Sequence, residues 1–464
     1  MALDSKAIIS RFQDYLRINT VQPNPDYYAA ANFIKLQAQS ISLQYQSIEF
    51  VQGKPIVLLK WAGSDPSLPA ILLNSHVDVV PFEAEKWDHP PLGAEIDEDG
   101  RIYARGTQDM KSVGMQYLEA IRKLVASGYK PLRSVYVTFV PDEEIGGADG
   151  VGRFVESEIF KSLSIAVVLD EGRKYLVKLI NITRHADSFF SELFEEMSTQ
   201  ILLTVMNESG LPSPTENYRV FNGERIPWSL QIKAVGQPGH GSKLYDDSAS
   251  ENLTKSIESM MRFRASQFDM LKAGLKPDGG VVSVNMVFLK AGTPSPDGFV
   301  MNLQPSEAEA GFDICIPPTA DLVALEKRLV EEWAPVSRNM SYKDFNKVVS
   351  DERVLSVCQL WRFDQNLSGK QLLTGNDNSN PWWGLLQNAV NEAGGKTSEP
   401  EIFPASTDSR YFRKAGLPAF GFSPISNTPS LLHDHNEYLS QAEYLRGIDM
   451  YVSIIKAYTS YSSP

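Results

Sequence analysis

The sequence predicts an α/β fold, in which a mostly parallel sheet is sandwiched by helices and carries an inserted α+β domain. Two observations predict this fold class. Short apolar runs of strand type alternate with segments of helical periodicity at both ends of the chain, as in parallel sheets. From about residue 226 the order changes to strand, helix, strand, strand, helix, which indicates a separate smaller domain.

The chain is expected to begin with two helices. Ser5 is a candidate cap for the first, because Ile8, Phe12 and Leu16 follow at helical spacing. The second is expected over residues 27–39.

Strands and one further helix are expected next. The helix covers residues 110–127, and Gly128 supplies its stop signal. The strand-like apolar runs lie at residues 55–61, 70–80, 134–140 and 165–169.

The inserted domain is expected at residues 226–340, so that the main domain comprises residues 1–225 and 341–464. The inserted domain should contain strands at residues 228–235, 280–290 and 308–316 and helices at residues 248–273 and 320–333. The main domain should resume with helix 380–393, strands 401–404 and 419–422, and a helix from Gln441.

Composition limits the class of protein. The chain has 464 residues, 42% hydrophobic and 22% charged, which is typical of a globular protein with two or more domains. Its formal charge of −13 argues against a nucleic-acid partner but permits a small anionic substrate in a locally positive pocket. No apolar run reaches the roughly 18 residues of a membrane span.

Cysteine usage and the N-terminal residues favour a cytoplasmic protein. Only Cys315 and Cys358 are present, so we expect no disulfide framework and a reducing compartment. The first residues, MALDSKA, are polar where a signal peptide needs an apolar stretch.

Polar side chains follow three of the predicted strands. His76, the pair Glu143 and Glu144, and Glu171 each lie at the carboxyl end of an apolar run. Because ligands bind beyond the carboxyl ends of parallel strands, we expect these side chains to meet at one edge of the sheet. Imidazole together with carboxylate suits zinc when a water molecule must stay reactive.

Each of these residues also has an ordinary structural explanation. Asp109 alone is most simply a helix cap, and His433 alone belongs to a solvent loop before the last helix. His76 and Asp78 are two residues apart, so on a strand they face the same side. Asp78 is then placed to orient the His76 ring through its second nitrogen. The joint occurrence of these motifs favours a metal site.

Five motifs make the chain resemble the metallo-aminoacylases, carboxypeptidases and dipeptidases that share a two-zinc site, and the aminoacylases most of all. The resemblance covers nearly the whole chain. Its motifs are NSHVDVVP at 74–81, IYARGTQDMK at 102–111, TFVPDEE at 138–144, NPWW at 380–383 and LLHDHNE at 431–437.

The resemblance implies two Zn²⁺ ions in each subunit, bound by His76, Asp109, Glu144, Glu171 and His433. Asp109 would bridge the ions. His76 and Glu171 would complete one ion, and Glu144 and His433 the other. His435 would not be a ligand.

The resemblance also implies roles for other residues. Glu143 would be the general base and later the general acid, and Asp78 would orient His76. His240, in GQPGHGS at 236–242, would reach the site of the partner subunit from an inserted dimerisation and lid domain. Asn302 matches a contact to the substrate carboxylate, and Arg410 is a second candidate for that contact.

The implied function is hydrolysis of N-acyl-L-amino acids to a carboxylate and a free amino acid, a step in amino acid metabolism, by a cytoplasmic homodimer. A dipeptidase or carboxypeptidase with the same metals is an alternative, because both cleave an amide next to a free carboxylate. A catalytically impaired member of the family is another.

Cys315 is the first departure from the family. It stands in FDIC at 312–315, where members usually carry an arginine that binds the substrate carboxylate. A thiol does not form the two parallel charge-assisted hydrogen bonds of a guanidinium. We therefore expect reduced substrate affinity or an altered preference.

The segment at residues 173–210 is the second departure, because related sequences pass almost directly from Glu171-Gly172 to a stretch like LPSPTE at 211–216. One interpretation is a retained intron or mis-predicted exon, since the codons for Arg173-Lys174-Tyr175 can contain a splice-donor signal. The other is a genuine lid or partner-binding insert, which would disturb Glu171.

Overall fold

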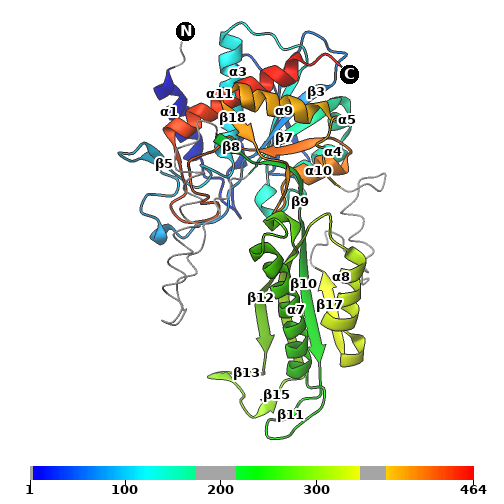
Figure 1. The fold of residues 1–464 in the computed structure, drawn as a ribbon. Coiled ribbons are helices and arrows are strands. Elements are labelled where there is room, and N and C mark those ends of the chain that lie inside the picture. The colour runs from blue at the N-terminus through cyan, green and yellow to red at the C-terminus, as the bar shows by residue number, and fades with distance from the viewer. Residues whose placement is uncertain (1–3, 173–215, 345–371, 464) are drawn as a thin grey trace, which may run out of the picture.

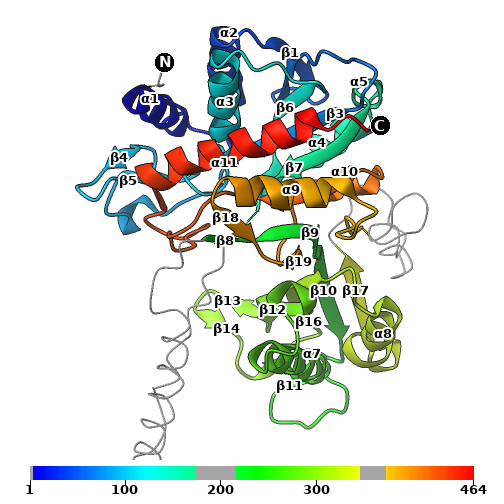
Figure 2. The same cartoon turned by 45° about the horizontal axis from the view of Figure 1, so that its top comes forward.

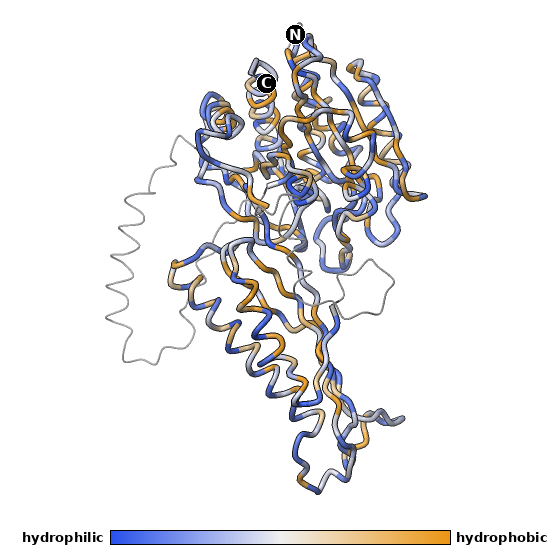
Figure 3. The backbone as a smooth tube through the Cα atoms, turned by 90° about the vertical axis from the view of Figure 1, so that its right-hand side faces the viewer, coloured by the Kyte–Doolittle hydropathy of each residue, from blue (hydrophilic) through white to orange (hydrophobic). Residues whose placement is uncertain are grey.

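The computed structural model describes residues 4–172, 216–344 and 372–463. The segment at residues 173–210 and Cys358 lie outside the described residues. The described chain forms a large domain and a small domain, which extends from one end of the large domain (Figure 1). Figure 3 shows the same two parts from the side.

The large domain is built on an eight-stranded mixed sheet. Its central strands β6, β3, β7 and β20 are parallel to one another, while β1, β2 and β9 join through antiparallel pairings. The strands in sheet order are β1 (Gln44–Glu49), β2 (Pro55–Trp61), β6 (Val135–Val140), β3 (Ala70–His76), β7 (Ile165–Asp170), β20 (Ala419–Phe422), β9 (Val220–Glu224) and β19 (Glu401–Phe403).

Helices cover both faces of this sheet (Figure 2), which confirms the predicted α/β class. Side chains alternate between the two faces along each strand. Leu73 therefore packs with one set of helices and Leu72 with the other. The first set is α1 (Ser5–Leu16), α2 (Tyr27–Ser40), α3 (Lys111–Ala126), α9 (Pro381–Glu392) and α11 (Gln441–Ser460). The second is α4 (Val151–Glu156), α5 (Glu158–Ser162) and α10 (Ser409–Lys414).

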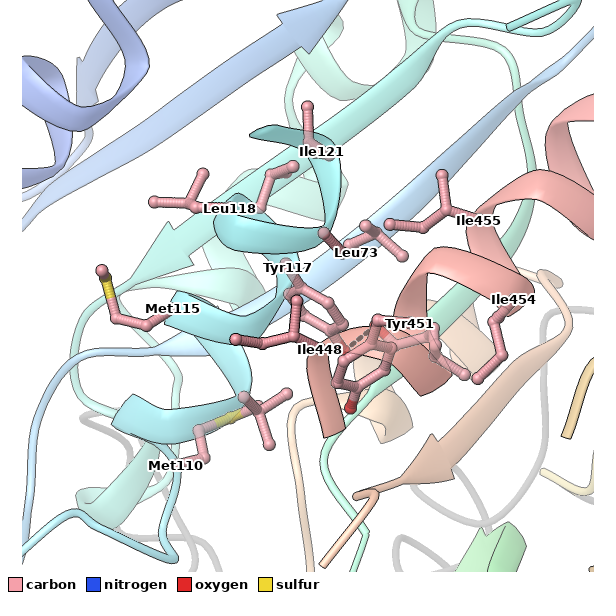
Figure 4. Close-up of a cluster of buried hydrophobic side chains, with 14 of the residues drawn as sticks. Leu73, Met110, Met115, Tyr117, Leu118, Ile121, Ile448, Tyr451, Ile454 and Ile455 are labelled. Carbon is pink, nitrogen blue, oxygen red and sulfur yellow. Dashed lines mark hydrogen bonds between the residues drawn. The ribbon is translucent and has the colours of Figure 1, made fainter. Parts of the chain in front are cut away.

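The larger of the two cores lies between the sheet and the helices α3 and α11 (Figure 4). Leu73 of β3 lies among side chains of both helices there, and Tyr117 of α3 packs edge-on against Tyr451 of α11 with ring centres 4.6 Å apart. Because α3 begins directly after Asp109 and Met110, this core also fixes the segment that carries Asp109.

The small domain is a four-stranded antiparallel sheet covered on one face by helices. Its strands in order are β12 (Ser283–Ala291), β16 (Glu307–Ile316), β10 (Ile226–Val235) and β17 (Met340–Asp344). The helices are α7 (Ala249–Lys272), α8 (Leu322–Arg328) and its π-helical continuation η4 (Leu329–Trp333). The small sheet thus extends past residue 340, where the sequence analysis placed the domain boundary.

Short elements complete the described chain. One small sheet contains β21 (Tyr438–Ser440), β5 (Arg101–Tyr103) and β4 (Glu95–Ile96). The two-stranded pairs are β8 (Glu216–Tyr218) with β18 (Gly395–Thr397), β11 (Gly239–His240) with β15 (Leu303–Gln304), and β13 (Pro294–Ser295) with β14 (Gly298–Phe299). The 3₁₀ turns are η1 (Ala84–Lys86), η2 (Glu143–Ile145), η3 (Asp278–Gly280) and η5 (Val336–Arg338). Within the described ranges, no helix combines the length and the apolar character needed to cross a bilayer.

The predicted cap of the first helix and the predicted end of the strand at residues 70–80 were wrong. The first helix is capped by Asp4, whose carboxylate accepts from the Lys6 backbone nitrogen, and Ser5 is already helical. The strand predicted at residues 70–80 ends at His76, because the chain then leaves the sheet and Val79 bridges to Val21.

We predict that Leu73→Ala destabilises the large domain by about 3 kcal/mol, because it leaves a cavity in a core that includes Tyr117 and Tyr451. Urea unfolding followed by tryptophan fluorescence measures the loss. Leu36→Ala on α2 is the matched control, since Leu36 is 55% exposed and its loss is expected to change stability by less than about 0.5 kcal/mol. Equal unfolding midpoints for the two variants would contradict the packing described here.

Candidate metal centre

The candidate site lies at one edge of the large sheet, where three neighbouring parallel strands end. His76 is the last residue of β3, Glu143 and Glu144 follow β6 in the turn η2, and Glu171 follows β7. β3 pairs in parallel with both β6 and β7, so the three strand ends lie side by side. The convergence predicted for these four residues is therefore confirmed.

Asp109 lies between two histidines that are far apart in the sequence. Its Oδ1 is 3.1 Å from Nε2 of His76, and its Oδ2 is 3.4 Å from Nε2 of His433. Nε2 of His433 is also 3.2 Å from Oε2 of Glu144. Asp109 is not a helix cap, since the capping position of α3 is Met110. Each oxygen of Asp109 thus faces one half of the cluster.

Glu171 and Glu143 lie on the His76 side of the cluster. Oε1 of Glu171 is 3.9 Å from Nε2 of His76. One ligand atom from each of His76, Glu143 and Glu171 falls within a mutual distance of 4.8 Å, and the same holds for His76, Asp109 and Glu144. The five predicted ligands and Glu143 therefore occupy one cluster.

The cluster concentrates negative charge in a buried place. Burial raises the pKa of Glu171 well above its ordinary value, and the charges of Asp109 and Glu143 raise it further. Burial and the charge of Asp109 also raise the pKa of Glu144. Hydrogen bonds to Asp109 and Glu144 raise the pKa of His433 to about 9. Burial and repulsion between the carboxylates therefore disfavour their charged forms, and a bound cation would offset this effect.

The residues present fit a pair of metal ions. Ligand atoms about 2.0–2.2 Å from one ion lie about 3–4 Å from each other, which is the spacing of the nitrogen–oxygen pairs in this cluster. Oε1 of Glu144 is buried and has no hydrogen-bond partner among the described residues, so it is available as a ligand. Two imidazoles with three carboxylates are a donor set that suits zinc and similar divalent ions.

Asp78 supports the cluster differently from the prediction. Because β3 ends at His76, Asp78 lies beyond the strand, and its carboxylate is 3.7 Å from Nδ1 of His76. The backbone carbonyl of Asp78 accepts from that nitrogen at 2.9 Å. The carboxylate instead accepts the backbone N–H groups of Glu143 at 3.1 Å and Glu144 at 3.2 Å, and the amide of Gln22 at 2.7 Å. Asp78 thus fixes both the histidine and the turn that carries the two glutamates.

Glu437 is a supporting residue to which sequence reasoning gave no role. It is fully buried, and its carboxylate binds Arg105 at 2.8 Å and the backbone N–H groups of Gly106 at 3.2 Å and Gln108 at 2.6 Å. It follows His433 by four residues, so it joins the loop of Asp109 to the loop of His433. The motif LLHDHNE contained this residue, but only the structure shows what it holds.

Arg410 lies beside the cluster on α10. Its guanidinium donates to the carbonyl of Thr407 at 2.8 Å and to that of Gly146 at 2.6 Å. Burial lowers the pKa of Arg410, but the negative charges of Glu224 and Glu143 help to outweigh it, so the pKa is raised. It is therefore a permanent positive charge close to Glu143.

His240 and Asn302 lie elsewhere. They are exposed residues at the end of the small domain, where β11 pairs with β15 and the Gly241 N–H donates to the Asn302 carbonyl at 2.7 Å. Figure 1 shows this end pointing away from the large sheet. Within one chain these two residues are not brought to the metal cluster.

Cys315 and His435 are also placed by the structure. Cys315 is on β16, where its backbone N–H donates to Oγ of Ser283 at 3.3 Å and burial raises the pKa of its thiol. Its effect on substrate affinity stays a prediction. Nε2 of His435 is 3.6 Å from Oε2 of Glu83, and His435 belongs to neither of the two potential metal-binding groups in the described chain.

We predict that Glu437→Gln weakens metal binding by about 10- to 100-fold, because loss of its charge loosens the loop of Asp109 relative to that of His433. Competition between the metal-free protein and a Zn²⁺ chelator measures the affinity. Glu119→Gln is the matched control, since Glu119 is equally buried and pairs with Arg11 at 2.6 Å outside the cluster. Equal affinities in the two variants would show that Glu437 has no positioning role.

The chain is similar in sequence to several aminoacylases. The chain is 39% identical to aminoacylase-1 of Mus musculus over 97% of its own length and 95% of that protein. It is 39% identical to aminoacylase-1 of Dictyostelium discoideum, covering 96% of each chain, and 37% identical to that of Homo sapiens, covering 97% and 95%.

Solved structures share the fold at low sequence identity. A metallo-carboxypeptidase from Sulfolobus solfataricus superposes with a TM-score of 0.65 at 15% identity, covering 99% of this chain and all of that one (100%). A dinuclear metal-binding peptidase from Bacillus subtilis superposes with a TM-score of 0.62 at 13% sequence identity, covering 98% of this chain and 99% of that one. Human carnosine dipeptidase 1 superposes with a TM-score of 0.58 at 13% identity, covering 98% of this chain and 97% of that one. Residues 72–457 match peptidase family M20/M25/M40. The chain is therefore a member of that family.

Proposed function

We propose that the protein is a zinc-dependent aminoacylase, which hydrolyses N-acyl-L-amino acids to a carboxylate and a free amino acid. The observation that carries the proposal is Asp109 lying between His76 and His433, with Glu143 beside them. Identity of 37–39% to aminoacylase-1 over nearly the whole chain supports this substrate class over dipeptides. A dipeptidase is the second candidate, because carnosine dipeptidase 1 shares the fold.

Five residues would hold two Zn²⁺ ions: His76, Asp109, Glu144, Glu171 and His433. When bound, zinc polarises a carbonyl and lowers the pKa of a coordinated water from about 15.7 to roughly 7. Glu143 is not needed as a ligand, so its carboxylate is available to take a proton from the attacking water and return it to the leaving nitrogen. Arg410 supplies positive charge for the substrate carboxylate.

A homodimer would complete the site. His240 and Asn302 are exposed at the far end of the small domain, so a second copy would bring them to the cluster. β12 supports this arrangement, because it is an edge strand of the small sheet and leaves Val287 at 64% and Leu289 at 56% exposed. Exposed apolar edge strands are usually covered by a partner. The small charged substrate and the scarcity of cysteine fit a cytoplasmic enzyme.

The proposed activity predicts turnover of N-acetyl-L-amino acids and weaker or absent turnover of dipeptides, both lost on chelation and restored by Zn²⁺. Glu143→Gln should lower kcat by about 10²–10⁴-fold, because the proton transfer is lost. Steady-state kinetics on both substrate panels measure these effects, and metal analysis should find unchanged metal in the variant. Dipeptides as the better substrates would favour the dipeptidase. Bound metal without turnover on either panel would favour an impaired family member, with Cys315 as the first suspect.

The proposed homodimer predicts complementation between two inactive variants. His240→Ala should lower activity by about 10²–10³-fold, because the imidazole no longer donates to the oxyanion that forms at the substrate carbonyl. Co-expression of His240→Ala chains with Glu143→Gln chains should restore about a quarter of wild-type activity, since half of the random dimers are mixed and each has one intact site. Each variant expressed alone is the control. No gain on co-expression would exclude sharing of His240 between subunits.

A further inference from the structure

A single residue separates the large sheet from the small sheet. β9 of the large sheet ends at Glu224, and β10 of the small sheet begins at Ile226, so that Arg225 alone lies between them. Figure 1 shows β9 leading into β10 where the two domains meet. Arg225 is 7% exposed, which is unusual for a residue with a permanent charge.

The Arg225 side chain binds backbone of both domains. Nε donates to the Pro404 carbonyl at 2.6 Å, and Nη2 donates to the same oxygen. Nη1 donates to the Val281 carbonyl at 3.1 Å. The Arg225 N–H also donates to the Phe403 carbonyl at 3.0 Å. Phe403 and Pro404 lie at the end of β19 in the large sheet, whereas Val281 leads into β12 of the small sheet. One guanidinium thus joins the two domains.

The two backbone segments that Arg225 joins also touch directly. A Cβ at Gly279 would lie 1.8 Å from the Ile402 carbonyl oxygen, so only glycine fits at this contact. The domains therefore meet backbone against backbone, and a buried cation holds the contact. Lysine at position 225 would offer a single ammonium in place of the planar guanidinium that reaches both Pro404 and Val281.

A chain of hydrogen bonds links the domain contact to the candidate site. Glu224, next to Arg225, accepts from Thr407 Oγ1 and from Arg413, both at 2.9 Å. The Thr407 carbonyl in turn accepts from the Arg410 guanidinium at 2.8 Å. The segment from Pro404 to Arg410 is therefore bound by Arg225 at Pro404 and by Glu224 at Thr407, and it carries Arg410 at its end.

We propose that Arg225 is a positioning residue, which fixes the orientation of the small domain on the large domain and, through the segment from Pro404 to Thr407, the position of Arg410. The consequence for Arg410 as a substrate-binding group rests on the proposed function. The link between the domains does not, because it involves only the chain itself. Arg225 touches neither the metal cluster nor the reacting atoms, and acts through Pro404 and Thr407.

Arg225→Lys tests the proposal against Arg133→Lys. Arg133 is a buried guanidinium that donates to backbone carbonyls, among them Tyr461 at 2.6 Å and Pro69 at 2.7 Å, within the large domain alone. Amide hydrogen exchange should become at least about tenfold faster in the segments 279–282 and 402–405 of Arg225→Lys. Exchange in those segments should be unchanged in Arg133→Lys.

Kinetics provide a second readout. Arg225→Lys should raise the KM for an N-acetyl-L-amino acid by about tenfold with less change in kcat, because Arg410 is displaced while the metal ligands and Glu143 stay in place. Its bound metal, measured by elemental analysis, should equal that of wild type. Identical exchange and identical KM in the two lysine variants would overturn the proposal. A wild type inactive on N-acyl amino acids would overturn the proposed function but leave the exchange result valid.

If Arg225→Lys does not fold, the wild type still provides a test. Native-state hydrogen exchange in increasing urea reports whether the segments 279–282 and 402–405 open as one unit. A common urea dependence supports the link through Arg225. Opening of one segment at a lower urea concentration than the other would show that the two domains are not joined there.

Discussion

The candidate site depends on one electrostatic constraint, the gathering of largely buried carboxylates around two imidazoles. Asp109 and Glu171 are buried, and their negative charges repel each other. Such an arrangement is stable only when protons or cations balance it. The surrounding structure therefore has to hold the carboxylates together against their repulsion.

Two buried carboxylates outside the cluster do this by accepting backbone N–H groups. Asp78 holds the turn of Glu143 and Glu144, and Glu437 holds the loop of Asp109. Each adds negative charge near the cluster, but the oxygens of each carboxylate accept hydrogen bonds from backbone N–H groups and thereby fix the loops that carry those groups. A carboxylate satisfied in this way costs less to bury than a free one and does not compete for the metal.

The sequence was sufficient for the parts that follow from local pattern. Apolar runs located β2 and β20 to the residue. Polar residues at the ends of the runs that form β3, β6 and β7 located His76, Glu144 and Glu171. The sequence was insufficient where contacts between distant segments determine the end of a strand or the role of a side chain. The early end of β3 depends on the bridge between Val79 and Val21, so the strand geometry expected for Asp78 did not hold. Glu437 was read only as part of a motif, since its partners lie about 330 residues earlier in the chain.

The division of the chain into a large and a small domain is related to the position of the cluster at the edge of the large sheet. A cluster at the edge of a sheet is open on one side, where His433 remains 46% exposed, so substrate can enter there. Under the proposed function, the groups that recognise substrate come from outside the strands that end at the cluster. Arg410 comes from α10, and His240 and Asn302 lie on a separate domain. Such groups act only when they are held at fixed distances from the cluster. Under the proposed function, substrate recognition therefore depends on the junction at Arg225, just as hydrolysis depends on the cluster.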